Sequence, residues 1–196
     1  MSTTQSAGLV IHGVVEQINS FIVGTADLDS SVNMISNQKD GLSALSLESG
    51  MHGDYGGCYI HWGVHEHAMM ATSNGIAAFN PCTTIPVTST FVRFVLYGAS
   101  AIRMGALQQL QVIPVATHDS IGMGEDGPTH QPIEVAALFR AMPNMICIRL
   151  ADSNETAGAW KVAIEAKQTP TIISLSAQHL PQYPDMTGQE EVANGA

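Results

Sequence analysis

Short apolar runs alternate with longer stretches of helical periodicity along this sequence, and this alternation restricts the fold more than any other feature. The apolar runs are rich in β-branched side chains and have the length of buried strands. They are Phe21–Thr25, Tyr59–Val64, Thr83–Thr88, Val112–Ala116, Met145–Leu150 and Thr171–Ser176. Helical patterns cover Leu9–Ile18, His67–Ala78, Phe91–Leu110, Pro132–Met142 and Asn154–Ala166. The sequence therefore predicts an α/β fold, a doubly wound and mostly parallel sheet flanked by helices on both faces.

The length of 196 residues suits one domain. We expect the domain to span 7–181, with a loose N-terminus at 1–6 and a loose polar tail at 182–196. Pro86 lacks a backbone N–H donor. We therefore expect it in an edge strand or at the end of a strand rather than inside a central strand. No apolar run is long enough to cross a bilayer.

Only 12% of the residues are charged, and the formal net charge is −10. The negative charge argues against nucleic acids and anionic membranes as partners. So little charge favours a surface covered by another protein, with self-association as a further expectation. Cys58, Cys82 and Cys147 show no CxxC spacing, which predicts reduced thiols and a cytoplasmic location.

One carboxylate, Glu66, lies where the run Tyr59–Val64 passes into the following helix. Open α/β folds place their chemistry at the carboxyl ends of parallel strands, so Glu66 is the first candidate for a functional residue. His61, His65 and His67 surround it, but a strand-to-helix joint would spread their rings apart. Packing or hydrogen bonding is therefore favoured over metal binding, and no metal site is predicted.

The segment 117–131 contains a formal GxGxxG pattern at Gly122, Gly124 and Gly127. A nicotinamide-binding function is the least favoured reading, because two acids lie inside the glycine triplet and the next helix begins only near Pro132. The segment is instead expected to present three polar side chains to a cavity, namely His118, Asp126 and His130. The alternative is that its Gly and Pro residues simply shape a surface loop.

Phe91, Phe94 and Tyr97 are spaced three residues apart and are expected on one helix face. Such a stripe usually packs in a core. It can also form a flat slot for an aromatic ring, and its position directly after a strand favours the slot.

Three motifs together resemble those of the transketolase family. They are Gly63-Val-His-Glu-His-Ala-Met69, Thr90-Phe-x-x-Phe-x-x-Tyr97 and Ala116-Thr-His-Asp-Ser-Ile-Gly-x-Gly-Glu-Asp-Gly-Pro-Thr-His-Gln-Pro132. The resemblance extends from about Ile22 to Tyr183 and covers the pyrimidine-binding (middle) domain. In detail it is closest to the dihydroxyacetone synthase-like branch.

The resemblance implies thiamine diphosphate as cofactor and gives each candidate a role. Glu66 would hydrogen-bond the pyrimidine nitrogen N1′, an acid–base function exerted through the cofactor. Phe91, Phe94 and Tyr97 would hold the pyrimidine, and Asp27 would lie near the thiazolium. The remaining candidates would face the donor and acceptor sugars; they are His118, Asp126, His130 and Ser31.

This sequence also departs from the family pattern. Arginines of the family are replaced by Cys58, His65 and Ala177, the last at a position that holds substrate phosphate. An acceptor aldehyde that is not a sugar phosphate is therefore expected.

The family's diphosphate-binding domain, with its Gly-Asp-Gly and Asn ligands for Mg²⁺, is not in this sequence. The resemblance thus implies a two-component transferase of ketol (two-carbon) units, a hetero-oligomer in which a separately encoded subunit holds the diphosphate and Mg²⁺. The alternative is a catalytically silent domain that acts as a binding or structural partner.

Overall fold

One six-stranded sheet forms the centre of the molecule, in the order β2-β1-β3-β4-β6-β5. The computed structural model describes residues 1–18, 20–34, 57–183, 188 and 191–192. Each pair of neighbouring strands is parallel. The strands are β1 (Phe21–Thr25), β2 (Tyr59–His61), β3 (Ile85–Phe91), β4 (Ile113–Thr117), β5 (Ile146–Arg149) and β6 (Thr171–Ser174). The predicted parallel sheet is confirmed.

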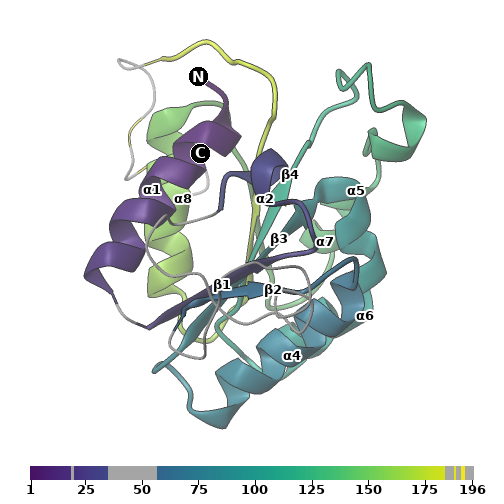
Figure 1. Ribbon diagram of the computed structural model, residues 1–196. Helices are drawn as coiled ribbons and strands as arrows, with labels where there is room; N and C mark the ends of the chain where they lie inside the picture. The colour runs from purple at the N-terminus through teal and green to yellow at the C-terminus, as the bar shows by residue number, and fades with distance from the viewer. Residues whose placement is uncertain (19, 35–56, 184–187, 189–190, 193–196) are drawn as a thin grey trace, which may run out of the picture.

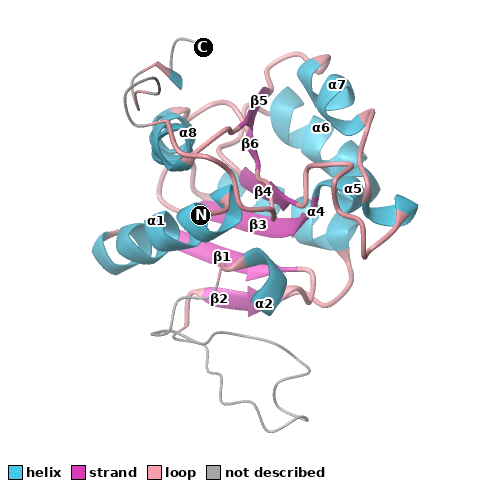
Figure 2. Cartoon of the chain, turned by 90° about the horizontal axis from the view of Figure 1, so that it is seen from above, coloured by secondary structure: helices cyan, strands magenta, loops and turns pink. Residues whose placement is uncertain are grey.

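Helices cover both faces of this sheet, as predicted (Figure 1). The helices α1 (Thr3–Gln17) and α8 (Ser153–Glu165) lie together on one face. The other face carries α4 (Glu66–Phe79), α5 (Val92–Val95), α6 (Ala99–Leu107) and α7 (Val135–Arg140). Figure 2 shows the sheet between these two layers, with α2 (Asp29–Val32) at the end that carries β1 and β2.

Each layer packs on the sheet through its own hydrophobic cluster. Ile11 of α1 and Trp160 of α8 are almost fully buried in the first cluster, against strand residues such as Ile113. Met69 of α4 and Phe139 of α7 are buried in the second. These two clusters fix the sheet between the helices and so hold the carboxyl ends of its strands in place.

Residues 3–6 belong to α1, so the expectation of a loose segment at 1–6 is wrong. Ser2 accepts a hydrogen bond from the Gln5 N–H at 3.1 Å, and the Gln5 side chain accepts one from the Ser2 N–H. This capping box satisfies backbone donors at the start of the helix. Its residues are polar, so the apolar periodicity placed the helix start too late. The tail expected at 182–196 lies mostly outside the described residues.

Pro86 lies in β3, a central strand, rather than at a sheet edge. The neighbouring Ile85 N–H donates to Ser20 O of the β1 side at 2.7 Å, so position 86 faces the β4 side. Pairing with β4 begins only at Val87, opposite Ile113. No partner strand therefore requires an N–H at Pro86, and the central strand tolerates it.

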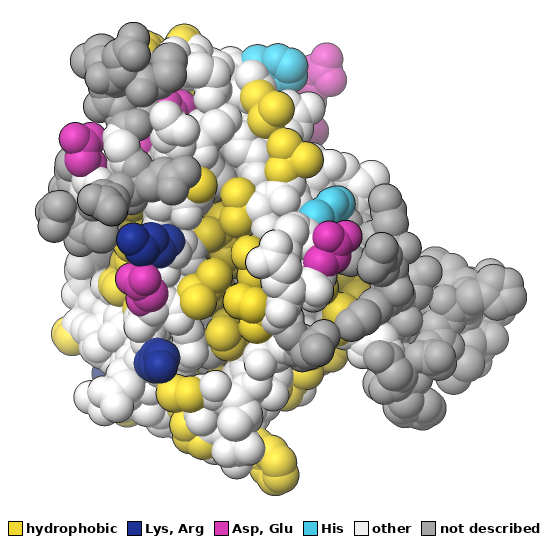
Figure 3. Space-filling view, turned by 90° about the vertical axis from the view of Figure 1, so that its left-hand side faces the viewer, with side chains coloured by type: hydrophobic (Ala, Val, Ile, Leu, Met, Phe, Trp, Pro, Cys, Tyr) yellow, Lys and Arg dark blue, Asp and Glu magenta, His cyan; other side chains and the backbone are white. Residues whose placement is uncertain are grey.

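The side of the molecule on which α1 and α8 lie shows hydrophobic side chains in a band down its middle and few charged ones (Figure 3). Leu9 of α1, for example, is 64% exposed. Within the described part of the chain, no helix has the length and apolar character needed to cross a membrane.

Candidate active site

Glu66 is the first residue of α4, which begins after a four-residue turn, 62–65, that follows β2. Gly63 turns the chain between the two elements with a φ of +65°, which a residue with a side chain rarely adopts. The Glu66 side chain is buried, with 8% exposure for the residue. Its position in the first turn of the helix favours a negative charge there. The predicted strand-to-helix joint is thus present.

Thr90 orients this carboxylate. Its hydroxyl donates to Glu66 Oε1 at 3.3 Å, and Thr90 itself is fully buried in β3. Among the described residues, Thr90 is the one whose side chain donates a hydrogen bond to the Glu66 carboxylate. Oε2 accepts no side-chain hydrogen bond from these residues. Sequence reasoning placed Thr90 in a motif but did not find this function, because a Thr in a strand is ordinarily explained by β propensity.

Three aromatic rings form a row that begins at Phe91, the residue after Thr90. The ring centroids of Phe91 and Phe94 are 5.7 Å apart with stacked planes, and those of Phe94 and Tyr97 are 6.2 Å apart. The helix predicted over Phe91–Leu110 is present from Val92 to Leu107, but the 3₁₀ helix η1 (Leu96–Gly98) interrupts it. Phe91 ends β3, Phe94 lies in α5 and Tyr97 lies in η1. The rings are adjacent nevertheless.

The two ends of this row differ in exposure. Phe91 is 7% exposed, whereas Tyr97 is 70% exposed. A hollow of about 390 Å³ lies at the exposed end, and its lining residues are Arg93, Phe94, Leu96, Tyr97 and Thr129. Flat apolar surface is therefore available at Phe94 and Tyr97, while Phe91 is covered by the protein's own side chains.

His118 and His130 cover Phe91. The His118 ring centroid is 3.8 Å from that of Phe91, and the His130 ring meets Phe91 and Phe94 edge-on at 5.7 and 5.0 Å. Burial lowers the pKa of His118 below its ordinary value, while the negative charge of the nearby Asp126 opposes this shift. The segment after β4 thus brings Asp126 and His130 near His118.

Asp27 and Ser31 lie beyond β1, at the same edge of the sheet as Glu66. Their neighbours are Asp29 and Tyr59 rather than the row of aromatic rings. Asp27 is exposed and has a φ of +61°; Ser31 is exposed on α2. Nearby, Asp29 accepts hydrogen bonds from Tyr59 and Thr25. Burial, this bond to Asp29 and, less strongly, the charge of Asp27 raise the pKa of Tyr59. The contacts of the described residues do not join Asp27 or Ser31 to the ring row.

The three histidines around Glu66 have separate partners. His65 contacts Trp62 O at 3.1 Å, His61 lies 3.4 Å from Asp29, and His67 contacts Ser100 at 3.4 Å. Among the described residues, no group of three or more His, Cys, Asp or Glu side chains is placed to hold a metal ion.

The glycine segment does not lead into a helix N-terminus. After Gly127, whose φ is +75°, the chain forms the short 3₁₀ helix η2 (Pro128–His130), and α7 begins only at Val135. The backbone N–H groups that would bind a pyrophosphate in a dinucleotide site are therefore not beside the glycines.

The family model described as "Transketolase, pyrimidine binding domain" matches residues 1–182. A dihydroxyacetone synthase of Candida boidinii is 44% identical over 196 residues, which are 99% of this chain and 28% of that protein. Transketolase 1 of Saccharomyces cerevisiae is 47% identical over 182 residues, 93% of this chain and 26% of that protein. The chain thus spans just over a quarter of the length of these relatives.

Solved structures agree with these relatives. A Pichia stipitis transketolase in complex with sedoheptulose-7-phosphate superposes with a TM-score of 0.92 and 43% identity, over 100% of this chain and 28% of that one. A structure described as a split gene transketolase, an inactive beta4 tetramer, has a TM-score of 0.71 and 25% identity, over 95% of this chain and 55% of that one.

Proposed function

The chain belongs to the transketolase family, of which it contains the pyrimidine-binding domain, and we propose that it supplies the pyrimidine half of a site for ketol transfer. The observation that carries this proposal is the buried Glu66 carboxylate, oriented by Thr90 at the carboxyl edge of the sheet. An aminopyrimidine needs a carboxylic side chain at its ring nitrogen and flat apolar surface along its ring. Glu66, Phe94 and Tyr97 fit both requirements.

When bound, thiamine diphosphate supplies the carbon nucleophile that accepts the ketol unit. Glu66 exchanges a proton with the pyrimidine nitrogen, and the rings of Phe94 and Tyr97 hold the pyrimidine in the orientation that this exchange needs. Asp27 lies toward the thiazolium end. Phe91 supports Phe94 from behind rather than offering its own surface.

His118, Asp126 and His130 act on the hydroxyl groups of the sugar donor and of the acceptor. Because burial lowers the pKa of His118, its imidazole is neutral near pH 7 and can accept a proton. His130 and Asp126 complete a polar wall near the reacting hydroxyls, and Ser31 contacts the far end of the acceptor. None of these residues provides a metal site in this proposal.

A separate subunit binds the diphosphate and Mg²⁺. Four of the exposed large hydrophobic residues lie within three positions of a candidate residue: Val64 (71% exposed), Tyr97 (70%), Ile121 (67%) and Ile133 (81%). Apolar side chains that surround a polar site in this way favour a protein partner closing over it. The likeness to a split-gene transketolase supports the same arrangement, with self-association of this chain as a further part of the proposal.

The acceptor is a small aldehyde rather than a sugar phosphate. Ala177 follows Ser176 just beyond β6, where the family pattern has the arginine that holds substrate phosphate. Without this guanidinium, a phosphate loses a bidentate partner. Ala177→Arg is expected to improve kcat/KM for phosphorylated acceptors over unphosphorylated ones in the assembled complex. An unchanged preference would contradict this specificity.

The central test combines this chain with a subunit that carries the Gly-Asp-Gly and Asn metal ligands, thiamine diphosphate and Mg²⁺. Carbon–carbon transfer is expected with the wild-type chain and is expected to disappear in Glu66→Gln, while gel filtration still shows the complex. The matched control is Glu165→Gln, an exposed acid at the end of α8. A wild-type rate in Glu66→Gln would remove the function assigned here.

The alternative function, a silent binding or structural domain, follows from the lost arginines at 58, 65 and 177. It predicts that the chain associates with such a subunit but that no aldehyde or ketose supports transfer by the wild-type complex. The same assay therefore distinguishes the two functions.

A further inference from the structure

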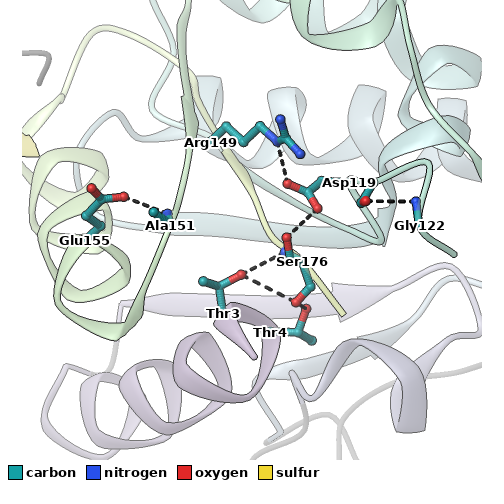
Figure 4. Close-up of polar contacts among 9 residues, drawn as sticks. Thr3, Thr4, Asp119, Gly122, Arg149, Ala151, Glu155 and Ser176 are labelled. Carbon is teal, nitrogen blue, oxygen red and sulfur yellow. Dashed lines mark hydrogen bonds and ion pairs between the residues drawn. The ribbon is translucent and has the colours of Figure 1, made fainter. Parts of the chain in front are cut away.

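Asp119 directly follows His118, and its carboxylate is held at both oxygens. Arg149 Nε donates to Oδ2 at 2.7 Å, and Ser176 Oγ donates to Oδ1 at 2.6 Å (Figure 4). The Asp119 side chain is 2% exposed, whereas that of Arg149 is 53% exposed. We propose that Asp119 is a positioning residue for His118, which it holds against Phe91 by fixing the turn beyond β4. This proposal rests on the function proposed for His118.

The carboxylate joins the ends of three strands. Asp119 follows β4, Arg149 is the last residue of β5, and Ser176 follows β6. The Asp119 N–H also donates to Leu175 O at 3.2 Å, which fixes its backbone beside the β6 chain. These bonds place the residue after His118 in one orientation.

The same group of hydrogen bonds reaches α1. The Ser176 N–H donates to Thr3 Oγ1 at 2.7 Å, and Thr4 Oγ1 donates to Ser176 O at 3.0 Å (Figure 4). Both threonines are buried. Asp119 is therefore linked, through Ser176, to the first turn of a helix that packs on the sheet.

His118 needs such an anchor because its backbone is strained. Its φ is +61°, a left-handed conformation that a residue with a side chain rarely adopts. On one side, Thr117 Oγ1 contacts His118 Nδ1 at 2.8 Å. On the other side the bonds of Asp119 hold the chain. If these bonds are lost, we expect the turn to relax and the imidazole to move away from Phe91.

The charges around His118 determine in which direction its protonation equilibrium moves when one of them is removed. Asp126 and Asp119 face it with negative charge, and His130 faces it from the same segment. Replacing Asp119 by Asn removes a negative charge, so protonated His118 becomes less favourable. Replacing Arg149 by Gln leaves the Asp119 charge uncompensated, so protonated His118 becomes more favourable.

The test is an NMR titration of the His118 ring protons in the 196-residue chain and its variants. Arg149→Gln is expected to raise the titration midpoint, because reduced burial of His118 and the uncompensated Asp119 charge both favour its protonated form. In Asp119→Asn reduced burial and the lost charge act in opposite directions, so the ring-current shift is the readout for that variant. Both variants are expected to reduce the ring-current shift that Phe91 causes. The matched control is Asp152→Asn, another almost fully buried acid, which caps α8 and is expected to leave both signals unchanged.

Unchanged ring-current shifts in Asp119→Asn and Arg149→Gln would overturn the proposal, as would a lowered midpoint in Arg149→Gln. If Asp119→Asn does not fold, Arg149→Gln and Ser176→Ala test the same prediction, since each removes one donor to the carboxylate. In the assembled complex, we expect Asp119→Asn to lower kcat by about tenfold or more with little change in the KM for thiamine diphosphate. The NMR result does not depend on catalysis, so failure here is distinct from failure of the proposed function.

Discussion

Thr90 donates a hydrogen bond to Glu66 across the junction between β3 and the first turn of α4, at 3.3 Å. The next residue of β3, Phe91, begins the row of aromatic rings. One strand end therefore orients the carboxylate and also begins the row of rings. This pairing depends on the neighbouring positions of β3 and α4 in space, since 24 residues separate Thr90 from Glu66 in the sequence.

Thr90→Val removes this hydroxyl while preserving side-chain shape. A hydrogen bond to a charged group contributes about 1.5–3 kcal/mol, so kcat of the assembled complex is expected to fall by about tenfold to a hundredfold. The control is Thr88→Val in the same strand, which is equally buried and donates instead to Met70 Sδ at 3.1 Å. Equal losses in the two variants would mean that the effect is on packing rather than on Glu66.

Gly98→Ala tests the close packing between η1 and α4. A Cβ at this position would lie 2.8 Å from Met70 Cγ and 3.3 Å from Glu66 O, so the Met70 side chain must move and the start of α4 is crowded. We expect a loss of about 1–3 kcal/mol in the free energy of unfolding. Gly75→Ala in α4 meets nothing within 4 Å and is expected to gain up to about 1 kcal/mol. Urea unfolding of both variants measures this difference, and equal stabilities would contradict the packing argument.

The burial of His118 makes stability depend on pH. Its folded-state pKa is lowered from 6.5, so the unfolded chain binds its proton at higher pH than the folded chain does. The contribution of His118 is therefore complete above the unfolded value and is lost as pH falls through the folded value.

Urea unfolding at about pH 7.5 and about pH 5.5, on either side of the unfolded pKa, checks this expectation. The fall in free energy of unfolding between the two conditions is expected to be smaller in His118→Gln than in the wild type. His179→Gln, at an exposed position, serves as the control and is expected to behave as the wild type. A full acid-dependent fall in His118→Gln would show that other groups cause it.

Ser2→Ala tests the capping box that starts α1. Loss of the side-chain acceptor is expected to cost about 1 kcal/mol and to lower Tm by about 2–4 °C. Ser2→Asp retains an acceptor for the Gln5 N–H and is expected to recover most of this stability. Calorimetry on the three proteins decides the matter, and an unchanged Tm in Ser2→Ala would indicate that burial of Thr3 and Thr4 alone holds this turn.

The sequence predicted the strands well where apolar runs were bounded by polar residues. Phe21–Thr25 has the bounds that the sequence indicated, because its run is β-branched and ends at a cluster of turn-forming residues. The sequence analysis missed the start of α1 and the interruption of the helix that follows Phe91. The first depends on a polar capping box, and the second on an aromatic stripe whose spacing fits a continuous helix and a broken one equally well.

The residues of the candidate site were also accessible from the sequence, but their contacts were not. Glu66, His118 and His130 are recognisable because they follow strands or lie in a distinctive glycine-containing segment. Thr90 and Asp119 lie in the same motifs, but their functions are not recognisable because their partners are far away in the sequence. Asp119 meets Arg149 and Ser176 only after three strands are paired.

By itself, then, the sequence determined the α/β alternation, the family and the side chains available for chemistry, since local periodicity and motif spacing encode these. Only the tertiary structure decided which oxygen of Glu66 is bonded, that Phe91 is covered and that a strained His118 lies beside it. Such relations depend on strand order and on packing between layers. Both follow from long-range contacts that no local pattern specifies.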